Sequence, residues 1–306
     1  MNVKLSIGIP TYNQGSYLEK TILSILNQTE KPFEIVISNN HSNDGDTDIV
    51  LEKYKNQIRV ISPPSFLTMM ENWNFLCKNL SGTHIALLSS DDYYEPNFVE
   101  SFHKIVKPDG VLYRFGFNLV DDDNQVLKTR KINSAKKITS FPENFYEQIR
   151  SPKTSFAAFV VEKEALKKVN YFDENLKLIG DWGLWLRLSP LGKFYYSENI
   201  VSNYRFEYRP TLTKDRFITN VTDFVYVYGT LQREIIEKYH LKKKINRNSI
   251  KCHLYKFEMQ RIDNKIEKPE ILTELEKLVD YNFIKSNLEF KVRMYYQTIR
   301  EHVFKR

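Results

Sequence analysis

The chain has 306 residues, of which 42% are hydrophobic and 27% charged, and this balance indicates one or two folded domains rather than a disordered or collagen-like chain. No apolar run reaches the ~18–20 residues that cross a bilayer, and the start of the sequence lacks the pattern of a secretion signal. The two cysteines, Cys77 and Cys252, predict no disulfide framework and no metal cluster. We therefore expect a cytoplasmic protein.

Regularly spaced apolar residues predict alternating strands and helices in the first third of the chain. Strands are expected at residues 3–9, 33–38, 59–62 and 84–89, and helices at residues 16–26, 47–54, 68–80 and 96–106. Ser16 and Glu19 have the spacing of a capping box at the start of the first helix. This order predicts a parallel α/β sheet, which binds ligands beyond the carboxyl ends of its strands.

The middle of the chain is mixed. Two strands, residues 111–120 and 126–132, surround the acidic run Asp121–Asp123, which we interpret as a hairpin turn rather than a metal motif. Further expectations are a strand at 156–161 and a short helix at 180–188. We predict two regions, residues 1–214 (halves 1–110 and 111–214) and a helical region, residues 215–306.

The net charge of +7 lies entirely in the last quarter of the chain. Residues 231–306 hold 18 basic and 11 acidic residues, and residues 1–230 hold 27 of each sign. Such a surface suits an anionic lipid, a nucleic acid or another charged partner, or it is simply a solvated helical face. No nucleic-acid-binding motif is present, so we expect no nucleic-acid partner.

Polar loops follow three of the predicted strands. The first begins with Pro10, Thr11, Tyr12 and Asn13, the second contains Asn39, and the third contains Ser90, Asp91 and Asp92. Carboxylates at the end of a strand suit a divalent cation that is shared with phosphate groups. Asp181 stands at the start of the helix expected at 180–188, where it suits either a general base or a helix N-cap.

These segments together resemble the family 2 glycosyltransferases, which are inverting enzymes of the GT-A fold. The resemblance covers residues 4–213 and rests on the order of PTYN (10–13), SILNQT (24–29), SSDD (89–92), GDWGLWLRL (180–188) and NYRFEYRPTLT (203–213). It implies a mostly parallel sheet flanked by helices, with a helical extension. Two positions depart from the family pattern, because Ser89 and Asn39 stand where acids are usual.

The resemblance also implies roles for single residues. Asp181 would be the catalytic base, Asp91 and Asp92 would hold Mn²⁺ or Mg²⁺, and Tyr12 would stack on the nucleotide base. Trp182 and Arg187 would lie on the acceptor side. The expected nucleotide-binding residues are Pro10, Thr11, Tyr12, Asn13, Asn39, Asn74, Ser90 and Asp91.

The implied function is metal-dependent transfer of a sugar from a nucleotide-sugar, with UDP favoured, to a saccharide or lipid-linked saccharide in surface polysaccharide synthesis. The basic region would then touch the inner face of the membrane or form a homodimer. Two alternatives stay open. One is a degenerate nucleotide- or saccharide-binding protein, and the other is a sugar-1-phosphate nucleotidyltransferase, which would need a Gly-rich basic loop that PTYNQGS (10–16) does not provide.

Overall fold

The computed structural model describes residues 2–131, 136–206, 213–242 and 247–278. Within these ranges no helix combines the length and the apolar character that crossing a membrane requires. Residues 279–306, which hold part of the predicted basic region, lie outside the described residues.

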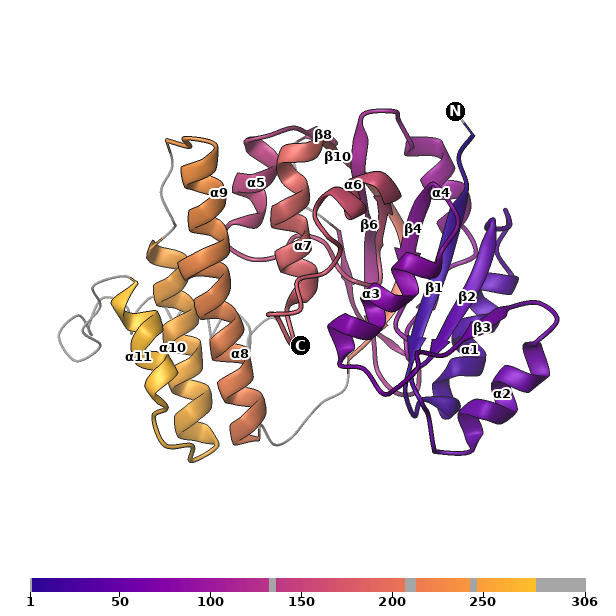
Figure 1. Cartoon of the computed structure of the whole chain (residues 1–306), viewed down its shortest axis with the longest axis horizontal. Helices are drawn as coiled ribbons and strands as arrows, with labels where there is room; N and C mark the ends of the chain where they lie inside the picture. The colour runs from indigo at the N-terminus through magenta and orange to yellow at the C-terminus, as the bar shows by residue number, and fades with distance from the viewer. Residues whose placement is uncertain (1, 132–135, 207–212, 243–246, 279–306) are drawn as a thin grey trace.

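The first third of the chain forms the parallel part of a central sheet, as predicted (Figure 1). Strands β1, β2, β3 and β4 pair in parallel in the order β3-β2-β1-β4, and helices connect them along the chain. The elements are β1 (Leu5–Thr11), α1 (Gly15–Leu26), β2 (Glu34–Asn39), α2 (Asp46–Tyr54), β3 (Arg59–Ile61), α3 (Met69–Asn79) and β4 (His84–Leu87).

The second part of the sheet is mixed. Strand β9 is antiparallel to β4 and β6, whereas the long strands β6 and β10 pair in parallel. The predicted hairpin around Asp121–Asp123 is confirmed as β6 and β7. The elements are β5 (Tyr93–Tyr94), α4 (Phe98–Ile105), β6 (Gly110–Val120), β7 (Val126–Arg130), β8 (Ile138–Thr139), α5 (Glu143–Gln148), β9 (Phe159–Glu162), α6 (Lys163–Lys168), α7 (Gly180–Leu188) and β10 (Lys193–Arg205).

Helices follow the sheet, as predicted, and stand beside α5 and α7 in Figure 1. They are α8 (Lys214–Tyr226), the π-helical turn Val227–Leu231, α9 (Gln232–Lys238), α10 (Arg247–Asp263) and α11 (Glu270–Lys277). Their apolar side chains share one buried cluster with Phe145 of α5 and with Trp182 and Leu186 of α7. The core therefore crosses the predicted boundary at residue 214, and the division into two domains stays a prediction.

Buried apolar side chains cover both faces of the sheet. One cluster joins β1 and β2 to α1, α2 and α4, and the other joins β4 and β9 to α3, α6 and α7. One local prediction is wrong: Ser16 and Glu19 form no capping box, because the N-cap of α1 is Gln14. The Glu19 carboxylate instead accepts a hydrogen bond from Tyr54 Oη at 2.7 Å, which ties α1 to α2.

Candidate active site

The loops after β1 and β2 are joined to each other by hydrogen bonds. Thr11 and Asn39 are register partners at the ends of these parallel strands, so the structure brings both loops together as predicted. The Asn13 backbone, held at a positive φ of 54°, donates to Ser42 Oγ at 3.0 Å. The Asn13 amide donates to Asn43 Oδ1 at 2.8 Å and accepts from the Asn43 backbone N–H at 2.8 Å. The two loops therefore form one preformed edge.

Tyr12 is exposed on this edge. Its ring is 44% exposed and makes an edge contact with Phe66 at a centroid distance of 5.0 Å. Pro10 and Thr11 are buried beneath it. The Asn39 amide donates to Asp48 Oδ1 of α2 at 3.2 Å and accepts from the Ser42 backbone N–H of its own loop at 2.9 Å, which leaves one amide hydrogen and one oxygen lone pair for a ligand.

The loop after β4 turns its two acids in different directions. Asp91 is half-buried, whereas Asp92 is 1% exposed and its Oδ1 accepts from the Arg205 backbone N–H at 2.8 Å. Burial, reinforced by neighbouring Asp91, raises the pKa of the Asp92 carboxyl well above its usual range. A carboxyl that is enclosed in the interior and bonded to the Arg205 backbone does not face a cation in the donor site. The assignment of Asp92 as a metal ligand is therefore wrong in this structure.

Arg205 connects this loop to the β6–β7 hairpin. Its guanidinium donates to the Asp91 carbonyl at 3.1 Å, to the Asp121 carbonyl at 2.8 Å and to Asn124 Oδ1 at 2.8 Å. It also lies 4.6 Å from the centre of the Tyr17 ring. Arg205 is thus a buried residue whose hydrogen bonds fix the Asp91 backbone.

A divalent cation has few protein ligands here. No three His, Cys, Asp or Glu side chains gather into a metal site in the part of the chain that the structure describes. With Ser89 in place of one acid and Asp92 turned inward, Asp91 remains as the carboxylate of the 89–92 loop that is not enclosed. Such a site fits Mg²⁺ or Mn²⁺ only when phosphate oxygens complete the coordination, which is usual for Mg²⁺ at phosphates.

Asp181 lies in a cavity of about 980 Å³ that also reaches Ser89 of this loop. The cavity therefore connects the proposed base with the 89–92 loop that follows β4. The other lining residues are Met69, Trp73, Phe117, Leu119, Arg130, Lys131, Glu147, Pro152, Lys153, Thr154, Ser155, Phe156, Leu178, Tyr204, Phe206 and Arg216.

The environment of Asp181 favours proton transfer. The N-cap of α7 is Ile179, so Asp181 belongs to the first turn and is not the cap. Its Oδ1 accepts from the Trp182 backbone N–H at 2.8 Å, and burial raises the pKa of its carboxyl to about 6. A carboxylate with that pKa is ionised at neutral pH and is a stronger base than an ordinary Asp.

Two predicted acceptor-side residues bond to the protein itself, Trp182 in the core and Arg187 at a half-buried position. Trp182 is 0% exposed, its Nε1 donates to the Gln148 carbonyl at 2.7 Å, and its ring contacts Tyr228. The Arg187 guanidinium donates to the carbonyls of Val169 and, at 2.7 Å, Tyr171. Both acceptor-side assignments are wrong, because α7 is covered on the side that these residues face.

Asn74 also forms its hydrogen bonds inside the protein. Its Nδ2 donates to the Phe172 carbonyl at 3.0 Å and to Glu174 Oε1 at 2.9 Å, and its Oδ1 accepts from the Phe172 backbone N–H at 2.9 Å. Asn74 is 4% exposed, so its amide is committed to the 172–174 segment. The prediction that Asn74 contacts the nucleotide is therefore wrong.

Several residues of the cavity escaped the sequence analysis. Phe117 of β6, Tyr204 of β10 and Phe206 come from segments far apart in the chain, as do Lys153 and Arg216. Phe117 follows the alternation of a strand, but only the sheet order shows which face it shares. Tyr204 and Phe206 lie within the NYRFEYRPTLT motif (203–213), two positions apart, as residues on one face of a strand do. This alternation was the signal available in the sequence.

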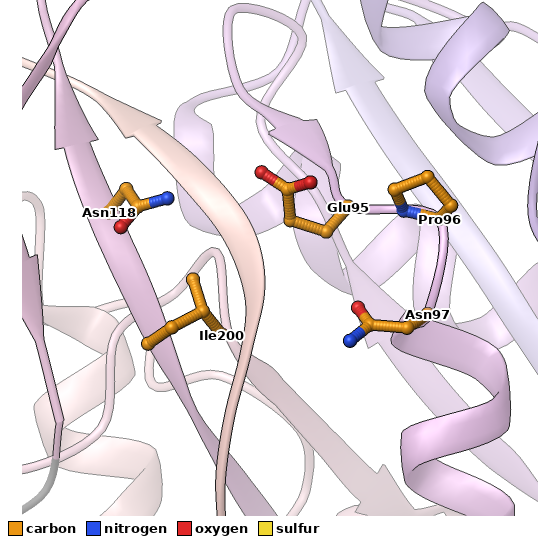
Figure 2. Close-up of a pocket in the computed structure, with 5 residues that line it drawn as sticks. All are labelled: Glu95, Pro96, Asn97, Asn118 and Ile200. Carbon is orange, nitrogen blue, oxygen red and sulfur yellow. The ribbon is translucent and has the colours of Figure 1, made fainter.

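A second hollow, of about 460 Å³, lies on the opposite face of β6 from Phe117, because Asn118 alternates with it. Figure 2 shows Asn118 and Ile200 on neighbouring strands, facing the 95–97 segment. The Asn118 amide donates to Asn203 Oδ1 at 3.1 Å, and the Asn203 amide donates to Glu95 Oε1 at 2.8 Å. These polar groups bond to one another, which makes the hollow a weaker candidate.

Two solved structures share this architecture. TarS from S. aureus, residues 1–349 in complex with UDP-GlcNAc, aligns with a TM-score of 0.56 at 14% identity, over 90% of each chain. The mannosyltransferase PcManGT from Pyrobaculum calidifontis, in complex with GDP-Man and Mn²⁺, aligns with a TM-score of 0.56 at 12% identity, over 98% of this chain and 80% of that chain. Together with the sheet described above, this likeness confirms the GT-A fold.

Curated relatives match at the level of sequence. An uncharacterized glycosyltransferase of Rickettsia conorii is 28% identical over 66% of this chain and 34% of its own length. The chondroitin synthase of Pasteurella multocida is 25% identical over 82% of this chain and 26% of its own. The chain thus spans about a third or less of these relatives. The model of "Glycosyl transferase family 2" matches residues 6–169, more than half of the chain, and the chain therefore belongs to that family.

Proposed function

We propose that this chain transfers a sugar from a nucleotide-sugar to a saccharide or lipid-linked saccharide, with inversion at the anomeric carbon. The observation that carries the proposal is the cavity shared by Asp181 and Ser89. A base of raised pKa thereby faces the same space as the end of the Asp91 loop. Family membership and the polysaccharide synthases among the relatives support a place in polysaccharide synthesis.

The donor occupies the edge formed by the loops after β1, β2 and β4. Tyr12 stacks on the base, and Asn39 pairs with it through an amide that both donates and accepts hydrogen bonds. Pro10, Thr11, Asn13 and Ser90 shape the backbone around the nucleotide. UDP is the favoured nucleotide, and the TarS complex with UDP-GlcNAc supports this choice.

Asp91 would hold Mn²⁺ or Mg²⁺ together with the donor diphosphate, and the bound cation would supply neutralisation of the leaving group's charge. The Mn²⁺ complex of PcManGT supports this part of the proposal. Arg205 keeps the Asp91 backbone in place through its carbonyl.

Asp181 provides the base for the transfer. The acceptor hydroxyl oxygen forms a bond to the anomeric carbon while the bond from that carbon to the diphosphate oxygen breaks. The hydroxyl proton passes to the Asp181 carboxylate, and the nucleoside diphosphate leaves with the electron pair. Attack from the face opposite the diphosphate inverts the anomeric centre.

Two departures, Ser89 and Asn39, favour a second candidate, a protein that binds a nucleotide or saccharide without turnover. Asp181→Asn separates the two functions. The protein is titrated with UDP, GDP, dTDP and CDP, each with and without Mn²⁺, and UDP release is measured from UDP-glucose and UDP-GlcNAc with added oligosaccharides. We expect Asp181→Asn to keep nucleotide binding and to lose ~10²–10⁴-fold in transfer rate.

Asp123→Asn, in the exposed hairpin turn, is the matched control and should leave both quantities unchanged. Full transfer activity in Asp181→Asn would refute the mechanism. Nucleotide binding by the wild-type chain without release of UDP from any donor would favour the binding protein.

A further inference from the structure

Four cationic side chains line the cavity of Asp181: Arg130, Lys131, Lys153 and Arg216. All four are exposed, and they come from β7 and the residue after it, from the loop after α5, and from the first turn of α8. Among the residues that the structure describes, none of the four forms an ion pair with a carboxylate.

The acids of the cavity do not balance this charge. Glu147 is paired with Arg114, with Nη2 and Oε2 3.2 Å apart, so Asp181 is the one acid of the cavity lining left to set against four cations. Four like charges around one space repel one another, and the repulsion is relieved when an anion enters. Exposed lysines elsewhere on the surface do find partners, for example Lys193 with Asp109 at 2.8 Å.

The donor diphosphate is not the natural partner of these four cations. The donor edge is built by the loops after β1, β2 and β4, and none of the four residues belongs to these loops. They instead surround the space in front of Asp181, together with the rings of Phe117, Tyr204 and Phe206. Aromatic rings beside cations suit a sugar ring that carries a negative group.

We propose that the acceptor is anionic, with a phosphate or carboxylate on or next to the sugar that receives the transfer. This inference rests on the proposed function and deepens it by naming the acceptor class. The cations bind the negative group of the acceptor, the rings pack on the sugar, and the accepting hydroxyl is thereby directed to Asp181.

The test compares three probes that share one sugar ring: glucose, glucuronate and glucose 6-phosphate. Each is titrated calorimetrically into the full chain with UDP and Mn²⁺ present, at low and at high salt. We expect at least one anionic probe to bind about tenfold or more tightly than glucose, because hydrogen bonds to charged groups are the stronger ones. High salt should reduce this preference.

Variants connect the preference to the cavity. Lys153→Gln with Arg216→Gln should reduce the affinity of the anionic probe to that of glucose, and Lys153→Arg should preserve it. Arg233→Gln, an exposed arginine of α9 that does not line the cavity, is the matched control and should change nothing. Unchanged thermal midpoints show that the variants fold.

The outcomes separate this inference from the proposed function. Equal affinity for all three probes overturns the anionic acceptor while UDP binding still supports the donor site. A second result also overturns the inference: the double variant loses more than about tenfold in UDP affinity while its affinity for the anionic probe is unchanged. The cations would then bind the diphosphate. A preference for glucose 6-phosphate or for glucuronate supports the inference and identifies phosphate or carboxylate. Absence of UDP binding contradicts the proposed function alone.

Discussion

The proposed donor edge and the proposed acceptor cavity are built in opposite ways. On the donor edge the polar side chains bond to the protein itself, as Asn13 does with Asn43 and as Arg205 does with three carbonyls. In the cavity, by contrast, Asp181 is desolvated and Lys153 and Arg216 lack a carboxylate partner within the described residues. The edge is thus held in place by its own hydrogen bonds before any ligand binds, whereas the charged groups of the cavity are available to bind a ligand.

This difference follows from chain connectivity. Loops at the ends of neighbouring parallel strands meet at one edge, so their short polar side chains reach one another without help. The cavity instead assembles from β6, β10, α7 and α8, which distant segments contribute. Two substitutions and a pH profile examine the contrast, in order of decreasing expected effect.

The largest effect is expected for Trp182→Ala, which should lower the free energy of unfolding by about 3–5 kcal/mol. The side chain is fully buried and hydrogen-bonded through Nε1, so its loss leaves a cavity and an unpaired Gln148 carbonyl. Denaturant unfolding measures the change, and Trp182→Phe should recover part of it. A variant of normal stability with a raised KM for the acceptor would restore Trp182 to the acceptor site.

Arg205→Lys should have a smaller effect, about 2–3 kcal/mol in unfolding, because an ammonium cannot replace the several bonds of the buried guanidinium. We also expect weaker UDP binding, since the Asp91 backbone loses its anchor. Titration with UDP and Mn²⁺ checks the second effect. Arg59→Lys, on the edge strand β3, is the control. Equal UDP affinity in the two variants would show that Arg205 does not support the proposed donor edge.

The smallest effect concerns pH. Because the pKa of Asp181 is raised to about 6, its basic form disappears as the pH falls through that value, and kcat/KM should fall about tenfold per unit below it. The charged groups that face the same cavity are Glu147, Arg130, Lys131, Lys153 and Arg216. The affinity for UDP-glucose measured in parallel without acceptor should stay level near pH 6, because its diphosphate is esterified at both ends and does not titrate there. A break in kcat/KM only below about pH 5 would contradict the burial of Asp181.

The sequence predicted the sheet and the positions of the polar loops after its strands well, and the packing of the interior poorly. The strands and the Asp91 turn carry local signals of period and turn chemistry, which survive folding. Trp182 was predicted to lie on the acceptor side, and Trp185 follows it three positions later in α7. Both are buried, because α7 packs on the sheet through Trp185 and on the C-terminal helices through Trp182. No local pattern shows that a second layer covers a helix.

Asn74 illustrates a related limit. Its position on α3 was consistent with the nucleotide, but its amide binds residues 98 and 100 positions later in the chain. An asparagine that stabilises a distant turn has the same spacing in sequence as one that contacts a ligand. Only the fold separates the two roles.

The anchoring of the β6–β7 hairpin has an evolutionary consequence. Two of the anchoring bonds from Arg205 reach the main-chain carbonyls of Asp121 and Asp122, and the main chain persists under most substitutions. The hairpin can therefore change its side chains, and the strand that carries Phe117 and Leu119 into the cavity can vary with it, while the Asp91 loop keeps its position. Acceptor preference is thus free to diverge among descendants that retain a common donor.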